Sequence, residues 1–247
     1  MSTISSQSDP NKPWNFVPSE NVPNYDLFVT EDGKPVDSFY SERQMRLLTD
    51  ALFASWKLSG EGREHIVASD VGLFYSVNKP PLVPDVFVSM DVTPPKNPWL
   101  KKYRSYYTWE YGKSPEMVVE IVSNKEGGEL STKLLDYARV GGIIYYVVWD
   151  PECHLSATRL HCFALTGKKY VPSEAWFPEM ELGVTTWQGS YDGMANTWLR
   201  WCDRNGVVLA TGVERAQTAE HRAESAEERA KILEAKLRAM GVDPSQP

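Results

Sequence analysis

A strand–helix–strand pattern between residues 117 and 149 constrains the fold of this chain more than any other feature. Residues 117–122 form an apolar run interrupted only by Glu120, residues 130–140 have helical spacing, and residues 143–149 form a second apolar run. Two consecutive strands that are joined through a helix usually pair in parallel. The pattern therefore predicts a parallel crossover inside a sheet that is flanked by helices.

The segments on either side of the crossover predict further elements. Apolar residues repeat at helical spacing from Ser41 onward, and the glycines at residues 60–62 are expected to end that helix. The strands expected outside the crossover are residues 65–77, 85–90, 155–165, 170–171 and 182–187. This order of elements predicts the α/β class, with an α+β mixed sheet and flanking helices.

Both predicted helices have an apolar face that we expect to turn inward. The side chains expected on these faces are Met45, Leu47, Leu48, Leu52, Phe53 and Trp56 in the first helix, and Leu134, Leu135 and Ala138 in the crossover helix. Gly141 and Gly142 follow the crossover helix and are expected to stop it.

Residues 213–240 carry a heptad repeat near the end of the chain. Its apolar residues step by three and four without a break, and the positions between them are mostly Glu, Arg and Lys. These apolar residues, named here the alanine seam, are Ala216, Ala219, Ala223, Ala226, Ala230, Leu233, Leu237 and Met240. The repeat predicts a coiled-coil helix that assembles a homodimer or a higher homo-oligomer. The alternative is a charged helix in solvent that forms only in part, because alanine buries little apolar area.

The remaining chain divides around these elements. We expect an extended or disordered arm at residues 1–24, one domain at 25–205, and a frayed tail at 241–247.

Composition excludes several classes of protein. Hydrophobic residues make up 42% of the 247 residues, yet no apolar run reaches the roughly 20 residues that a membrane helix needs. The polar N-terminus does not resemble a secretory signal, and three scattered cysteines do not predict a disulfide framework, so we expect a cytoplasmic protein. The net charge of −7 argues against a protein that coats nucleic acid, but less against a nuclease, which needs only a local basic patch.

Three residues are candidates for metal-dependent chemistry. Asp85 follows Pro84 at the start of a predicted strand, Glu120 interrupts an apolar strand, and Lys133 lies near the start of the crossover helix. Taken alone, Asp85 is better explained as a turn cap, and the explanation of Lys133 as a helix-surface residue is strong. An acid in an apolar strand, close to the ends of a crossover sheet where ligands bind, points more strongly to function. Lys125 is a competing lysine, since it lies nearer to Glu120 in sequence.

Together these residue types indicate phosphodiester hydrolysis. Two carboxylates on neighbouring strands can hold Mg²⁺, or Mn²⁺ in its place, because hard cations prefer oxygen ligands. The cation would polarise a phosphoryl oxygen, and a nearby lysine would stabilise the developing negative charge.

The segment 96–113 interleaves basic and aromatic residues. Such a segment can follow phosphates while its aromatic rings stack on bases. The candidate nucleic-acid contacts in it are Lys101, Lys102, Arg104, Tyr106 and Trp109. An equally weighted alternative is an aromatic loop that packs on its own domain and leaves its lysines in water.

Several motifs together resemble the Uma family of proposed restriction endonucleases, a branch of the PD-(D/E)XK nuclease superfamily. The motifs are Pro-Asp, then Val-Glu-Ile-Val-Ser, then Lys-Leu-Leu-Asp-Tyr-Ala-Arg-Val-Gly, and finally Tyr-Tyr-Val-Val-Trp-Asp-Pro. The likeness spans roughly residues 38–190 and includes neither the N-terminal arm nor the heptad repeat.

The resemblance implies a restriction-endonuclease-like core, often dimeric, with Mg²⁺ held at the positions matching Asp85 and Glu120. The superfamily pattern would place its lysine at Val122, so the resemblance implies that the lysine has moved to the following helix, at Lys133. Superfamily members often add an acid or amide from the first helix, for which Glu42 and Gln44 are the candidates.

Two functions follow as hypotheses. The first is a Mg²⁺-dependent endonuclease acting on nucleic acid, with DNA expected. The second is a catalytically inactive nuclease-fold protein that binds or assembles through its C-terminal coiled coil.

Overall fold

A computed structural model describes residues 38–60, 63–76, 79–125 and 128–240. The arm expected at 1–24 and the tail expected at 241–247 lie outside the described residues. In this described part, no helix is both long enough and apolar enough to cross a membrane.

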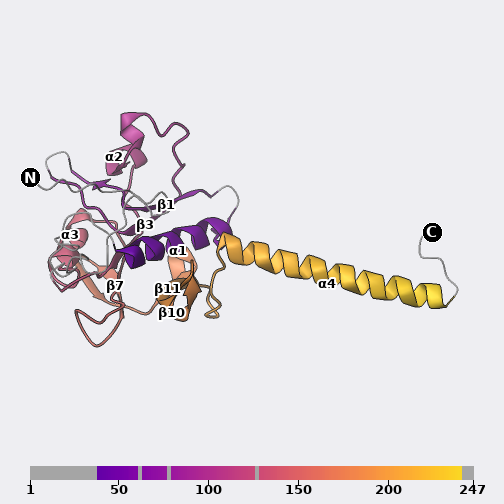
Figure 1. Ribbon diagram of the computed structural model, residues 1–247. Coiled ribbons are helices and arrows are strands. Elements are labelled where there is room, and N and C mark those ends of the chain that lie inside the picture. Colours follow the sequence, from indigo (N-terminus) through magenta and orange to yellow (C-terminus); the bar gives the residue numbers. More distant parts are fainter. Residues whose placement is uncertain (1–37, 61–62, 77–78, 126–127, 241–247) are drawn as a thin grey trace, which may run out of the picture. The chain divides into compact units, whose positions relative to one another are not determined.

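A six-stranded mixed sheet forms the centre of the fold, in the order β1-β3-β5-β6-β7-β8 (Figure 1). These strands are β1 His65–Ser69, β3 Val86–Met90, β5 Met117–Ile121, β6 Tyr145–Trp149, β7 Leu160–Thr166 and β8 Lys169–Pro172. Strands β5 and β6 pair in parallel, and helix α3, Thr132–Val140, connects them. The other neighbours in this sheet are antiparallel. The predicted crossover and the mixed sheet are therefore confirmed.

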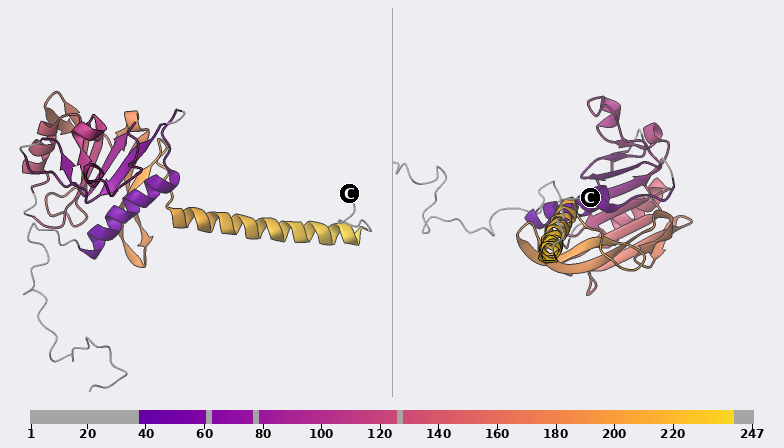
Figure 2. Two further views of the ribbon diagram at one scale, coloured as in Figure 1. Left: turned by 90° about the horizontal axis from the view of Figure 1, so that it is seen from above. Right: turned by 90° about the vertical axis from the view of Figure 1, so that its right-hand side faces the viewer.

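A second sheet packs with helix α1, Phe39–Ser55, on one face of the central sheet (Figure 2). It consists of β9 Trp176–Phe177, β10 Leu182–Tyr191 and β11 Met194–Cys202, and the short helix η4 Pro178–Met180 lies between β9 and β10. Side chains from α1 and β11 share one hydrophobic core with the central sheet. This layer supports the central sheet from the side opposite α3.

The segment between β3 and β5 forms small elements of its own. It contains η3 Lys101–Tyr103, β4 Tyr106–Tyr107 and α2 Thr108–Tyr111. Strand β4 pairs in parallel with β2, Leu73–Phe74, in a separate two-stranded sheet. The predicted excursion is thus tied back to the chain that precedes β3.

Alternation along β5 separates its side chains between two cores. Met117, Val119 and Ile121 join the core under α1, whereas Val118 and Val122 join the core under α3. Successive residues of a strand point to opposite faces, so Glu120 turns toward α3. This orientation places the acid beneath the helix that carries Lys133.

Helix boundaries and faces differ from the prediction in three places. Helix α1 ends at Ser55 and not at the glycines, because Trp56 is extended and its indole donates to the Met180 carbonyl. Phe53 and Leu135 were expected inside, but they are 66% and 52% exposed. The buried side chains of α3 are Tyr137, which was not expected to face inward, and Ala138, which was.

Two predicted strands were longer than the observed ones, and one observed strand was not predicted. The strand expected over 65–77 stops at Asp70, whose positive φ of 54° turns the chain before β2 begins. The strand expected from residue 155 begins at Leu160. Strand β11 was not predicted, although it buries Trp198 and Trp201 completely.

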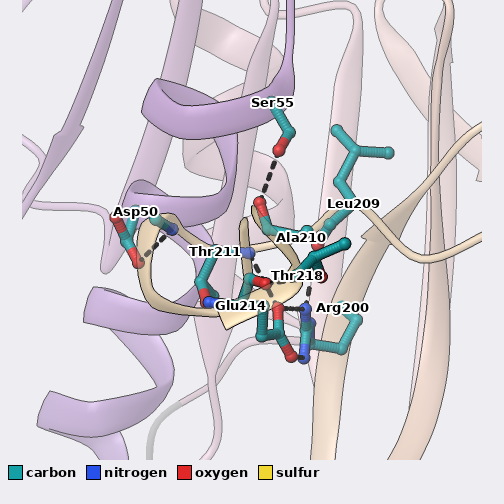
Figure 3. Close-up of polar contacts among 9 residues, drawn as sticks. Asp50, Ser55, Arg200, Leu209, Ala210, Thr211, Glu214 and Thr218 are labelled. Carbon is teal, nitrogen blue, oxygen red and sulfur yellow. Dashed lines mark hydrogen bonds and ion pairs between the residues drawn. The ribbon is translucent and has the colours of Figure 1, made fainter. Parts of the chain in front are cut away.

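Helix α4, Gly212–Ala239, confirms the predicted C-terminal helix. Thr211 caps its N-terminus, and its hydroxyl accepts from the Glu214 backbone while the Glu214 carboxylate accepts from the Thr211 N–H. Figure 3 shows the contacts around this cap, in which Arg200 donates two bonds to Glu214, at 3.0 and 2.7 Å. From residue 215 onward every residue of the helix is exposed.

Candidate active site

Strand register brings Asp85 beside Glu120. Val86 of β3 lies opposite Val119 of β5 in an antiparallel pair. Continuing this register by one residue places Asp85 opposite Glu120. One carboxylate oxygen of Asp85 accepts a hydrogen bond from the Ile121 backbone N–H at 2.5 Å. The half-buried Asp85 side chain is therefore held against the strand that carries Glu120.

The Glu120 carboxylate is buried and bonded at both oxygens. Its exposed fraction is 1%, Lys133 Nζ lies 2.9 Å from Oε2, and the Tyr137 hydroxyl donates to Oε1 at 2.5 Å. Burial raises the pKa of Glu120, and the positive charge of Lys133 and the Tyr137 hydrogen bond oppose that rise. The three predicted residues Asp85, Glu120 and Lys133 thus come from neighbouring segments that meet below α3.

Glu129 is a further acid in this cluster that the sequence did not single out. It is 4% exposed, and its Oε1 lies 3.1 Å from Lys133 Nζ. Its Oε2 is buried and has no hydrogen-bond partner among the described residues. The Tyr146 hydroxyl donates to the Glu129 backbone carbonyl at 2.8 Å, which fixes the segment before α3. Because a buried carboxylate oxygen rarely lacks a partner, Oε2 is a candidate contact for an additional ligand.

Lys133 is the cation of this cluster. Burial lowers the pKa of a lysine, but here the adjacent Glu120 and Glu129 carboxylates raise the pKa of Lys133 above its ordinary value. Its ammonium is therefore charged at neutral pH and faces two acids. The available signal was spacing, since Glu129 and Tyr137 lie four residues before and after Lys133, although only Tyr137 is in the helix with it.

The other proposed site residues lie in different contacts. Lys125 is exposed in the segment that follows β5. Glu42 pairs with Arg46 on the outer side of α1, at 3.3 Å. Gln44 is fully buried and exchanges two 2.9 Å hydrogen bonds with the Leu199 backbone. The amide of Gln44 therefore joins α1 to β11 and is committed to the fold.

The aromatic and basic segment divides into buried and exposed members. Tyr106, expected to contact bases, is 2% exposed, bonds Ser89 at 2.8 Å and stacks on Tyr111, so this prediction was wrong. Lys102 is paired with Glu110 at 2.5 Å. Arg104 is exposed, and Trp109 is 53% exposed.

Lys101 lies in η3 beside these residues. A cavity of about 540 Å³ is lined by residues 91–97, which follow β3, and by Leu100, Tyr103, Glu110 and Tyr111. Asp85, Glu120 and Lys133 do not line it.

The acids of the cluster fit an open magnesium site. Mg²⁺ commonly binds through one or two carboxylates and keeps several waters, and Glu129 Oε2 is a buried oxygen that has no donor among the described residues. Over the described residues, no group of three or more histidine, cysteine, aspartate and glutamate side chains is placed to hold a metal ion, so a cation here would rest on fewer carboxylates and on water. Carboxylate oxygens are ligands that suit a hard, partly hydrated cation.

The mixed sheet, its crossover helix and the acid–lysine cluster define a restriction-endonuclease-like protein. A family model named Uma2, with the description "Putative restriction endonuclease", matches residues 31–189, and the chain belongs to that family. No curated protein matches the chain.

Proposed function

We propose that this protein is a Mg²⁺-dependent endonuclease that hydrolyses phosphodiester bonds in DNA. The observation that supports this most directly is the buried cluster in which Lys133 lies 2.9 Å from Glu120 and 3.1 Å from Glu129. Membership of the Uma2 family supports nuclease activity independently. The reaction would take place in the cytoplasm, in keeping with three free cysteines.

Each residue of the cluster has a role in this proposal. Asp85 and Glu120 would hold Mg²⁺ or Mn²⁺, which supplies Lewis-acid catalysis at the phosphate when it is bound. Glu129 would support that site through Oε2, which has no hydrogen-bond partner among the described residues. Lys133 would stabilise negative charge that develops on the phosphoryl oxygens. The Tyr137 hydroxyl fixes the orientation of Glu120.

The test of this function is cleavage of supercoiled plasmid and of single-stranded DNA, with Mg²⁺ or Mn²⁺ and with a chelator. We expect nicked or linear products only when the cation is present. Metal binding without cleavage of either DNA would instead favour the second function, a nuclease-fold protein that binds or assembles. One observation favours that alternative, since both Glu120 oxygens are already bonded within the protein.

Replacing Glu129 by glutamine should weaken Mn²⁺ binding about tenfold, the lower end of the loss typical for a residue that supports a metal site. The amide keeps the size of the side chain but removes the charge that would face the cation. Isothermal titration calorimetry with Mn²⁺ measures the change without requiring activity. Glu228→Gln, on the exposed part of α4, is the matched control. Equal Mn²⁺ affinity for Glu129→Gln and the wild-type protein would remove Glu129 from the site.

Replacing Trp109 by alanine should weaken binding of DNA about tenfold, because one base stacked on an aromatic side chain contributes about 1–3 kcal/mol. Arg104→Glu should weaken binding as well and lower its dependence on salt. Fluorescence anisotropy with labelled DNA in chelator measures both effects. Lys168→Glu, a charge reversal at an exposed position between β7 and β8, is the control. Unchanged affinity in both variants would favour the alternative that this segment only packs on its own domain.

A further inference from the structure

Among the residues that the structure describes, nothing covers the alanine seam of helix α4. All eight seam residues are exposed, and the apolar ones at its end include Leu233 at 60% and Met240 at 77%. The contacts described for α4 with the core lie at its beginning, where Gly212 bonds Asp50 and Arg215 donates to the Ala54 carbonyl. An apolar heptad seam of this length is covered in other proteins by a second helix.

The charges beside the seam are sorted by sign. With Ala216 taken as heptad position a, the positions that flank the seam on one side, g, are all basic, and those on the other side, e, are all acidic. The g residues are Arg215, Arg222, Arg229 and Lys236, and the e residues are Glu220, Glu227 and Glu234. A helix that only needed solvent-exposed charge would not require this separation.

We propose that α4 pairs with α4 of a second copy of this chain in a parallel, in-register coiled coil. In a parallel pair each g residue faces the e residue of the next heptad on the partner helix. Arg222 would then face Glu227, and Arg229 would face Glu234, so the flanking contacts join opposite charges. In an antiparallel pair g faces g and e faces e, which would oppose arginine to arginine and glutamate to glutamate.

Intramolecular contacts leave most of these charges available. Within residues 212–240, the ion pairs described are His221 with Glu224 and Glu234 with Arg238. Arg222, Arg229 and Glu227 have no such pair in this range. Arg215 is the exception among the g residues, since it bonds Ala54 of its own chain.

The anchored start of α4 gives the parallel arrangement a consequence for the proposed nuclease. Because the cap and Arg200 hold the helix start to the core, a parallel pair places both cores at the same end of the coiled coil (Figure 3). An antiparallel pair would separate the two helix starts by roughly 40 Å, the length of a 28-residue helix. Two sites at one end suit cleavage of both strands of a duplex, a benefit that rests on the proposed function.

Engineered disulfides test the orientation. In a parallel pair, Ala219→Cys should form a disulfide with a second copy of the same variant, and so should Leu237→Cys. A mixture of the two variants should give no disulfide between position 219 of one copy and position 237 of the other. An antiparallel pair would give mainly the mixed dimer. Ser225→Cys, off the seam, and the wild-type chain with its three free cysteines are the controls. A monomer in sedimentation velocity, with crosslinking no greater than in the controls, would overturn the proposal.

Charge reversal tests the pairing rule. Arg222→Glu/Arg229→Glu and Glu227→Arg/Glu234→Arg should each weaken self-association by roughly tenfold, since several exposed ion pairs become repulsive. An equimolar mixture of the two variants should recover the association of the wild-type protein. Failure of the mixture to recover would contradict the proposal. Because neither experiment uses metal or DNA, both can succeed in a protein without nuclease activity, and both can fail in an active nuclease.

Discussion

Replacing Lys133 by methionine should lower the rate of DNA cleavage by at least about 10²-fold, as expected when one stabilising group is removed from a preorganised site. Lys133 lies within 3.1 Å of both Glu120 and Glu129, and among the described residues no other cation pairs with these two acids. Methionine keeps the apolar stem and removes the charge. Initial rates of plasmid cleavage at saturating Mg²⁺ measure the loss.

Lys125→Met is the matched control for that experiment. It removes the same charge from an exposed lysine that lies near Glu120 in sequence but on the segment after β5. We expect its cleavage rate to stay within a few-fold of the wild-type rate. If Lys125→Met lost activity and Lys133→Met kept it, the lysine of the site would be Lys125. Glu120→Gln should be as inactive as Lys133→Met.

The sequence predicted the central part of the fold because its signals there agree with one another. Between residues 117 and 149, apolar runs, helical spacing and the stop at Gly141 all indicate the same crossover, and the structure confirms it. The second sheet was harder to predict. Strand β11 alternates Trp198, Arg200 and Cys202 with other large residues, and it pairs with a long β10 through a turn at Asp192 and Gly193. Its burial depends on α1, which lies about 150 residues away in sequence.

The candidate site was predictable only in part, for a related reason. Glu120 was found because it stands out in an apolar strand, whereas Asp85 and Lys133 were found through their company and the motifs that resemble the Uma family. Glu129 and Tyr137 do not stand out in that way. Their importance comes from the packing of α3 over β5, which buries Glu129 and brings the Tyr137 hydroxyl to Glu120.

Tyr106 shows the opposite case. It lies among basic and aromatic residues that suggested a nucleic-acid contact, but pairing of β4 with β2 buries it against Ser89. A composition signal in a loop does not distinguish residues that face solvent from those that anchor the loop.

Glu214→Gln should lower the free energy of unfolding by about 2–3 kcal/mol, less than the roughly 3–5 kcal/mol for a fully buried ion pair. Arg200 is 2% exposed and would lose the carboxylate that lies 2.7 Å away, which leaves a buried charge without its partner. The expected loss is smaller than for a fully buried pair because Glu214 itself is partly exposed. Glutamine can still complete the helix cap, so the change isolates the charge. Calorimetry should show a midpoint lower by roughly 5–10 °C, whereas Glu228→Gln should leave it unchanged.

The pH dependence of this loss distinguishes the ion pair from a packing defect. Burial raises the pKa of Glu214, but its bonds with Arg200 and Thr211 outweigh burial and hold the pKa below its ordinary value of 4.5. A carboxyl whose pKa is lowered by folding stabilises the fold above its unfolded pKa, and that stability disappears as the pH falls through the folded pKa. The difference between wild type and Glu214→Gln should therefore be complete near pH 7 and should shrink below about pH 4.5. A difference that stayed constant down to pH 3 would assign the loss to packing, and the anchoring of α4 would then not depend on the charge of Glu214.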